Sequence, residues 1–268
     1  MKLSEFFAVL DEVSPKTLSD EYCANYGAYD NSGILVDTGE EITGAVFALD
    51  LSFKAIARAK DTGANVIVTH HPAIYGKIDG IRTGDIEPLG EKLIACIRNG
   101  ISVVAMHLNL DTAVDGIDES LCEGVCKACG MERAQNVTVM HPLIGGGYGR
   151  VYDVNETALS VFTDGLKRVF QTERLLVYGQ RESISRVASF CGAGVDEESI
   201  TFAIKQGADT IVSSDWKHHL ITFATERGLT VVNITHYASE FYGFEKYYKK
   251  ISQRAGVTCT LFAQRALL

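Results

Sequence analysis

The chain has 268 residues, 46% of them hydrophobic and 22% charged, which is the composition of an ordinary globular protein. Its net charge is −9 and no Lys/Arg cluster stands out, so duplex nucleic acid is not expected as a partner, because nonspecific phosphate binding needs a basic face. No segment resembles a membrane span or a secretory leader. The seven cysteines show no zinc-ribbon spacing and are interpreted as reduced thiols. A cytoplasmic protein without a membrane partner is therefore predicted.

Helix and strand signals alternate through the first half of the chain. Helices are expected at 1–20 (with a stop near Ser14 and Pro15), 52–60, 88–99 and 120–129, and strands at 33–36, 44–49, 66–69 and 101–106. Ser52 is the expected N-cap of the second helix. Apolar residues at helical spacing predict the inward-facing positions, namely Leu3, Phe6, Phe7 and Leu10, then Phe53, Ile56 and Ala57, then Leu89, Leu93, Ile94 and Ile97.

The second half begins with a glycine-rich stretch at 145–150, which we interpret as a loop-rich crossing between halves. Helices are then expected at 157–170 and 198–206, and strands at 174–178 and 184–190. Gly192 and Gly194 precede the 198–206 helix, so this turn either seats an anion at the helix N-terminus or is a simple tight turn. The helix after Glu240 carries apolar residues at core spacing, namely Phe241, Phe244, Tyr248 and Ile251.

Two stretches of the first half recur in the second. Residues 63–69 (GANVIVT) match 207–213 (GADTIVS), and 100–104 (GISVV) match 228–232 (GLTVV). The matches predict two similar α/β lobes, 1–130 and 131–268, related by a pseudo-dyad, with mixed sheets flanked by helices. Such an arrangement would bring the polar strand ends of the lobes face to face. Chance similarity between α/β segments is the alternative explanation.

Histidines and carboxylates gather where four of the expected strands end. These strand ends are His70-His71-Pro72, His107 to Asp111, Asp215 to His219 and His236 to Glu240. Open α/β sheets bind ligands at the carboxyl ends of their strands. Imidazole and carboxylate together suit divalent metals such as zinc, iron, manganese or nickel. The alternative is that these are ordinary polar ends of strands.

The motifs resemble those of the Nif-three-like dinuclear-metal proteins, many of which are named GTP cyclohydrolase 1 type 2 homologues. The resemblance covers nearly the whole chain and rests on residues 29–33 (YDNSG), 68–72 (VTHHP), 107–111 (HLNLD), 147–150 (GYGR), 215–219 (DWKHH) and 236–240 (HYASE). The chain departs from the family pattern at Tyr29, where Trp is common, and at Ser213-Ser214. It also lacks the domain that longer members insert between the halves, so it is the compact form.

The resemblance implies two divalent metal ions held by five residues, His70, His71, Asp111, His236 and Glu240, with Glu240 bridging the ions at a site between the lobes. It places His107 in a substrate-facing or ligand-supporting position, and a hydrogen-bonded histidine that orients the loop is the alternative. It also puts His218 and His219 in the same cleft, where one of them would transfer protons, although two solvated loop residues are an alternative. The family also implies a homohexamer.

The implied activity is that of a dinuclear metal-dependent hydrolase, in which metal-activated hydroxide attacks a nucleotide such as GTP or a related small molecule. Tyr237, Phe241 or Trp216 could stack on a base, although each of these types is more often packed in a core. A phosphoesterase is one alternative. A metal-binding chaperone or regulatory scaffold without turnover is another.

Overall fold

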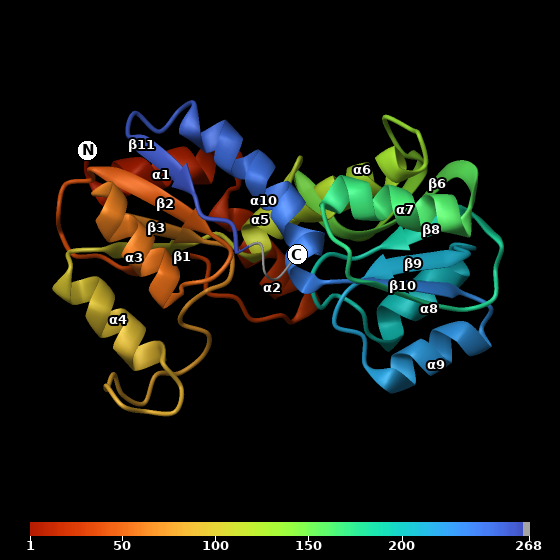
Figure 1. Cartoon of the computed structure of the whole chain (residues 1–268), viewed down its shortest axis with the longest axis horizontal. Coiled ribbons are helices and arrows are strands. Elements are labelled where there is room, and N and C mark those ends of the chain that lie inside the picture. The colour runs from red at the N-terminus through yellow and green to blue at the C-terminus, as the bar shows by residue number, and fades with distance from the viewer. Residues whose placement is uncertain (265–268) are drawn as a thin grey trace. The chain divides into compact units, whose positions relative to one another are not determined.

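The computed structural model describes residues 1–264, which form two compact units. The first unit consists of residues 1–113 and 244–264, and the second of residues 114–243. Each unit contains one mixed sheet with helices packed against it (Figure 1). Residue 130, where the lobes were expected to divide, lies inside the second unit, and the chain returns to the first unit partway along its last helix.

The first unit is built around a five-stranded sheet. Its elements are α1 (Leu3–Val13), α2 (Lys16–Tyr26), β1 (Gly33–Val36), β2 (Gly44–Ala48), α3 (Phe53–Thr62), β3 (Val66–Thr69), α4 (Leu89–Arg98), β4 (Ser102–Ala105), α5 (Leu108–Thr112), the C-terminal part of α10 (His236–Ser252) and β11 (Thr258–Leu261). The strand order is β1-β4-β3-β2-β11, in which β1 runs antiparallel to β4 and the other neighbours are parallel. The expected strands are all present, because short β-branched runs suit buried parallel strands.

The helices of the first unit cover both faces of its sheet. Ile56 of α3 and Leu93 of α4 pack with Ile67 of β3 in one apolar cluster. On α10, the rings of Phe244 and Tyr247 lie 6.3 Å from the Phe47 ring of β2. The sheet is therefore buried on both faces, which explains why β2, β3 and β4 contain no exposed residue.

Three of the predicted inward positions are wrong. Phe53 is 45% exposed and Ile97 is 54% exposed, and Ala57 also faces solvent. In α3 the buried side is formed by Ala55, Ile56 and Ala59, because the helix turns a stripe of small residues toward the sheet. Ser52 does cap this helix, accepting a hydrogen bond from the Ala55 amide. The expected 1–20 helix is divided at Ser14 into α1 and α2.

The second unit is built around a six-stranded sheet. Its elements are α6 (Ile117–Ala128), β5 (Gln135–Leu143), β6 (Gly146–Ala158), α7 (Leu159–Phe170), β7 (Leu175–Tyr178), β8 (Ser183–Ser189), α8 (Glu197–Lys205), β9 (Thr210–Ser213), α9 (His218–Glu226), β10 (Thr230–Ile234) and the first turns of α10. The strand order is β5-β6-β8-β9-β10-β7. Figure 1 shows α6 and α7 on one side of this sheet and α8 and α9 on the other.

The prediction of a loop-rich crossing at 145–150 is wrong. This glycine-rich stretch forms the turn and first residues of a β-hairpin. β5 pairs antiparallel with β6 from Leu143 and Gly146 onward. Gly149 has a φ of 71°, and a Cβ there would lie 2.7 Å from the Phe190 ring. The glycines therefore serve close packing inside a strand, which composition alone does not separate from a loop.

The two units repeat one topology, which supports the internal repeat of the sequence. In the first unit β2, β3 and β4 are parallel neighbours joined by α3 and α4, with β1 antiparallel on β4. In the second unit β8, β9 and β10 are parallel neighbours joined by α8 and α9, with β7 antiparallel on β10. Strands β3 and β9 are thus counterparts, as are β4 and β10.

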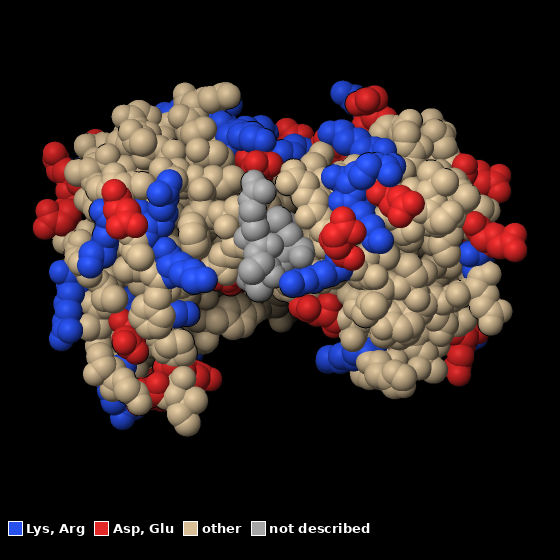
Figure 2. All heavy atoms as spheres, in the orientation of Figure 1, with Lys and Arg blue, Asp and Glu red and all other residues tan. Residues whose placement is uncertain are grey.

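The surface carries both signs of charge. On the face shown in Figure 2, acidic and basic side chains are interspersed over both units. Within residues 1–264, none of the helices has the length and apolar character that crossing a membrane requires.

Candidate metal centre

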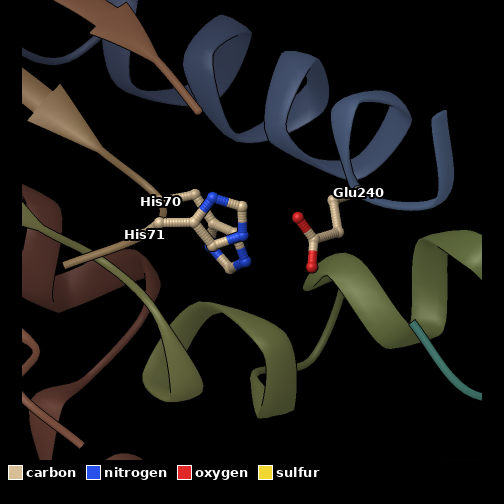
Figure 3. Close-up of side chains that lie close together, drawn as sticks. All are labelled: His70, His71 and Glu240. Atoms are coloured by element: carbon tan, nitrogen blue, oxygen red, sulfur yellow. The ribbon is translucent and has the colours of Figure 1, made fainter. Parts of the chain in front are cut away.

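The first unit places a group of histidines at the carboxyl ends of β3 and β4. His70 and His71 follow β3 directly, and Pro72 prevents the strand from continuing. Figure 3 shows the two imidazoles side by side at the end of this strand, with their ring centroids 4.9 Å apart. The His107 ring, which follows β4, lies 5.2 Å from the His70 ring. Parallel strand ends thus gather three imidazoles on one edge of the sheet.

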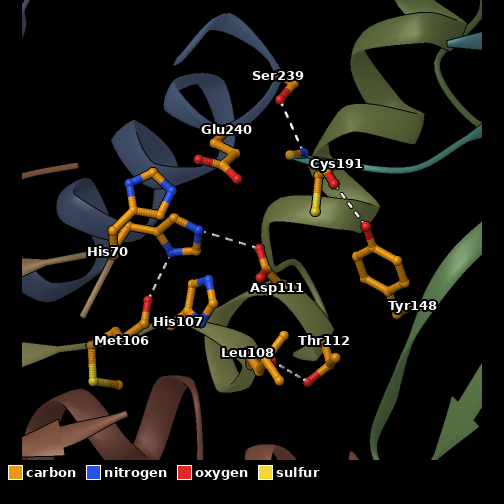
Figure 4. Close-up of polar contacts among 12 residues, drawn as sticks. His70, Met106, His107, Leu108, Asp111, Thr112, Tyr148, Cys191, Ser239 and Glu240 are labelled. Carbon is orange, nitrogen blue, oxygen red and sulfur yellow. Dashed lines mark hydrogen bonds and ion pairs between the residues drawn. The ribbon is translucent and has the colours of Figure 1, made fainter. Parts of the chain in front are cut away.

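His70 is fully buried and its orientation is determined by the backbone. Its Nδ1 donates a hydrogen bond to the Met106 carbonyl oxygen at 2.8 Å. A carbonyl oxygen only accepts hydrogen bonds, so Nδ1 carries the proton and Nε2 of the neutral ring has a lone pair. This Nε2 lies 3.5 Å from the Asp111 carboxylate (Figure 4). In the neutral ring, Nε2 and the carboxylate are two electron-pair donors in a buried position, where a cation would be stabilised.

His107 stands at the N-cap of α5 and is oriented by Asp30. Its Nδ1 lies 2.7 Å from the Asp30 carboxylate, whose side chain is 1% exposed. The hydroxyls of Ser19 and Ser32 also donate to this carboxylate, at 2.6 and 2.5 Å. Burial by itself would raise the pKa of Asp30, but the hydrogen bonds from His107, Ser19 and Ser32 outweigh it and hold that pKa well below its usual range. Asp30 is therefore a charged acceptor.

The same carboxylate affects the charge of the imidazole. Burial tends to lower the pKa of His107, but the hydrogen bond to Asp30 and the nearby Asp111 charge raise it above the ordinary value. His71 is arranged in the same way, with its Nδ1 2.8 Å from the Asp50 carboxylate. Ligand atoms of His70, His107 and Asp111 lie within 4.8 Å of one another, so this group could hold a metal ion.

The second unit carries a smaller donor group at the start of α10. The Nδ1 of His236 lies 2.5 Å from the Asp215 carboxylate, and its Nε2 lies 2.9 Å from the Glu240 carboxylate, four residues further along the helix. Asp215 follows β9 with a positive φ of 53°, a conformation that costs a non-glycine residue about 1–2 kcal/mol. Figure 3 draws the Glu240 side chain on α10. Only 4% of this side chain is exposed, whereas 32% of the His236 side chain is.

The absence of a side chain at Gly192 leaves room for the Glu240 carboxylate. A Cβ at Gly192 would lie 2.4 Å from the Glu240 Oε1, and the residue has a φ of 56°. Its amide also donates to the Ser239 hydroxyl at 3.1 Å. Gly192 therefore forms a tight turn, which was one of the two interpretations of this stretch of the sequence. At the N-terminus of α8, the Asp196 side chain accepts the Ser199 amide hydrogen bond, so the chain's own carboxylate takes the place of an anion.

Four of the seven histidines share one arrangement. In each of them Nδ1 faces an oxygen, which comes from Met106, Asp50, Asp30 or Asp215. Histidines that bind metals almost always donate their other ring N–H to such an oxygen, which fixes the tautomer and directs the free nitrogen at the ion. The donor chemistry within each unit therefore fits a divalent metal.

The structure does not bring every predicted residue into these groups. His218 and His219 lie exposed in the first turn of α9, and within residues 1–264 their side chains form no hydrogen bond or ion pair. Asp30 and Asp50 were not predicted from the sequence, because their roles depend on contacts with residues 77 and 21 positions away along the chain. The one signal for Asp30 was its place in the YDNSG motif.

Comparison with known proteins shows which family the chain belongs to. The family model described as Duf34/NIF3 (NGG1p interacting factor 3) matches residues 1–265. The chain belongs to this family. A GTP cyclohydrolase 1 type 2 homolog of Clostridium perfringens is 30% identical over 95% of this chain and 92% of its own length. A second protein of that name, from Methanocaldococcus jannaschii, is 29% identical over 94% of this chain and 95% of its own length.

Two solved structures share the fold. The Staphylococcus aureus hypothetical protein SA1388 aligns with a TM-score of 0.81 at 22% identity, covering 99% of this chain and 97% of that protein. The structure described as reduced HcgD from Methanocaldococcus jannaschii aligns with a TM-score of 0.78 at 27% identity, covering 97% of both chains. The mixed α/β architecture with two flanked sheets is therefore that of the family.

Proposed function

We propose that this Duf34/NIF3 protein is a dinuclear metal-dependent hydrolase that acts on a nucleotide or a related small molecule. The proposed ligands of two divalent ions are His70, His71, Asp111, His236 and Glu240. The observation that supports the ligands best is the shared orientation of His70, His71 and His236, each with Nδ1 at an oxygen. Zinc, iron, manganese and nickel all suit imidazole and carboxylate donors.

The residues around the donors have roles that do not depend on which ion binds. When bound, two divalent ions would act as a Lewis acid and lower the pKa of a coordinated water. Asp30 holds the His107 ring in a fixed tautomer, so that His107 presents Nε2 for a ligand, a substrate or a proton. His218 or His219 is the proposed group for proton transfer to and from bulk solvent, because both are exposed.

Nucleotide hydrolysis is supported by the names of the relatives. Proteins matching more than nine-tenths of this chain are named GTP cyclohydrolase 1 type 2 homologs. A GTP cyclohydrolase would open the imidazole ring of the purine by adding water at C8. The experiment is to incubate the metal-loaded chain with GTP and follow the nucleotide and its products by liquid chromatography with mass detection. A generic phosphodiester substrate, bis(p-nitrophenyl) phosphate, tests the phosphoesterase alternative in parallel.

Each outcome of this experiment has a defined meaning. Product that forms with metal, disappears with a chelator and is lost in Glu240→Gln supports the hydrolase. A chain that holds two ions and converts neither substrate contradicts the hydrolase and favours the metal-binding scaffold. We further propose the homohexamer that family membership implies, which light scattering would detect as six times the 29.2 kDa chain mass.

A further inference from the structure

A pocket in the second unit adjoins the His236 donor group and is lined wholly by residues of that unit. Its volume is about 670 Å³, within the range of about 300–1,000 Å³ that small-molecule sites occupy. Its wall includes Glu173, Arg174, Trp216, Asn233 and His236. One end of the pocket therefore reaches a proposed metal ligand, and the rest offers one aromatic ring, one amide and charges of both signs.

Trp216 is the chain's single tryptophan and is held in place by the loop after β9. The Ser214 hydroxyl of this loop donates to the Gly192 carbonyl oxygen at 2.5 Å, and Asp215 adopts its left-handed conformation one residue before Trp216. The loop is thus fixed by the same Asp215 that orients His236. A preorganised half-buried indole binds a flat ring at a low cost in conformational entropy.

Asn233 supplies hydrogen-bonding groups from within a strand whose other residues are buried. It belongs to β10, where Val231, Val232 and Ile234 are all buried. Within residues 1–264 its side-chain amide makes no hydrogen bond, so both its donor and its acceptor are available to a ligand. The equivalent position of the first unit, Ala105 of β4, carries no polar group. The amide therefore has no counterpart in the repeated topology of the first unit.

We propose that this pocket binds the heteroaromatic base of a nucleotide, with Trp216 stacking on the ring and Asn233 hydrogen-bonding to its polar edge. Arg174 at the rim supplies positive charge for a phosphate, and His236 places the bound molecule beside the proposed metal donors. This inference rests on the proposed function, because it names the class of substrate that the same centre would take. A base and not a free phosphate is favoured, because the wall offers the Trp216 ring and the Asn233 amide, while its two carboxylates, Glu173 and Asp215, outnumber its one Arg.

The single tryptophan makes base binding directly measurable. The metal-free chain is titrated with guanosine, guanosine 5′-monophosphate and ribose 5-phosphate while Trp216 fluorescence is followed, with N-acetyltryptophanamide correcting for absorption by the base. Saturable changes are expected with guanosine and its monophosphate, and none with ribose 5-phosphate. No saturable change with either base-containing ligand, or an equal change with ribose 5-phosphate, would overturn the proposal.

Variants test the two named contacts by equilibrium dialysis against radiolabelled guanosine 5′-monophosphate. Base stacking on an aromatic side chain predicts that Trp216→Ala weakens binding about 5- to 150-fold and that Trp216→Phe retains most of it. Asn233→Ala is expected to weaken binding about 2- to 12-fold, the effect of one lost hydrogen bond. Phe53→Ala removes an exposed aromatic ring from α3, in the other unit, and is expected to change nothing.

The experiment separates this proposal from the metal proposal, because it uses metal-free protein. Guanosine binding by a chain that never takes up metal would support the pocket and contradict the metal centre. Two bound ions with no guanosine binding would support the metal centre and contradict the pocket. Wild-type affinity in a folded Trp216→Ala variant, with circular dichroism confirming the fold, would also overturn the stacking role.

Discussion

The two units share a strand order but place different side chains at the ends of equivalent strands. β3 ends in His70 and His71, whereas its counterpart β9 ends in Ser214 and Asp215. His70 is fully buried, and its Nδ1 is bound to a backbone carbonyl. The Asp215 side chain is 51% exposed and orients another residue's imidazole. The first unit therefore holds its donors rigidly, while the second combines its donors with an open pocket.

After the next strand the two units are alike. A histidine followed four residues later by a carboxylate occurs as His107 and Asp111 after β4, and as His236 and Glu240 after β10. Both histidines donate a hydrogen bond from Nδ1 to an aspartate carboxylate. The two units thus share the hydrogen bond that orients a histidine, and they differ in how deeply their donor residues are buried. If this comparison is correct, changes in the first unit affect metal affinity most.

The largest effect is expected from His70→Ala, with Ser214→Ala as its counterpart in the second unit. His70 presents Nε2 from a fully buried ring, so its removal takes away a donor that solvent does not replace. Ser214→Ala removes only a hydroxyl that donates to Gly192. Elemental analysis of both variants should show most of the metal lost in the first and full occupancy in the second. Equal metal content in the two would break the comparison.

The next effect is expected from Gly192→Ala, which removes no donor atom. The new Cβ would collide with the Glu240 carboxylate, so metal content should fall. Gly207→Ala is the matched control, because its φ of 74° is similar and nothing lies within 4 Å. Both variants should lose about 1 kcal/mol in the free energy of unfolding from left-handed strain. A parallel loss of metal in both would show that strain, and not displacement of Glu240, is responsible.

Asp30→Asn should have an intermediate effect on metal affinity. The His107 ring that Asp30 orients lies 5.2 Å from the ring of the proposed ligand His70, so the loss should be smaller than the 10- to 100-fold, roughly, that removing the partner of a ligand histidine itself causes. Asp153→Asn serves as the control, because Asp153 is also a paired carboxylate, bound by Arg186 in the second unit. Competition with a fluorescent chelator measures both affinities. An unchanged affinity in Asp30→Asn would mean that His107 takes no part in the metal centre.

The smallest effect on metal is expected from His218→Ala and His219→Ala. Both side chains are exposed, so metal content should stay at the wild-type level and the free energy of unfolding should change by less than about 0.5 kcal/mol. If one of them transfers protons, that variant alone should lose hydrolysis by about 10²-fold or more. Loss of metal in either variant would contradict their placement outside the donor groups.

Much of the fold follows from local sequence signals. The parallel strands were predictable because β-branched runs such as 66–69 occur between helix ends and polar residues, and the repeated runs gave the shared topology. The hairpin of β5 and β6 was not predictable, because one of its glycines, Gly149, is dictated by the distant Phe190 ring. The predicted buried face of α3 was wrong at Phe53 and Ala57, because small residues can also form the buried face of a helix.

The candidate site was also predictable only in part. The histidines were visible because they end strands, and the strand order then gathers His70 and His107. The aspartates that orient them were not visible, because Asp30 and Asp50 reach their imidazoles through tertiary contacts. Exposure of His218 and His219 likewise depends on where α9 begins.

The central claim is that these oriented imidazoles and carboxylates hold two metal ions, and metal content per chain tests it most directly. Elemental analysis would be done on wild type and Glu240→Ala after reconstitution with zinc, iron, manganese and nickel in turn. The account predicts about two divalent ions per wild-type chain and a sharp fall in Glu240→Ala. A wild-type chain that takes up none of the four metals, or an unchanged content in Glu240→Ala, would contradict it.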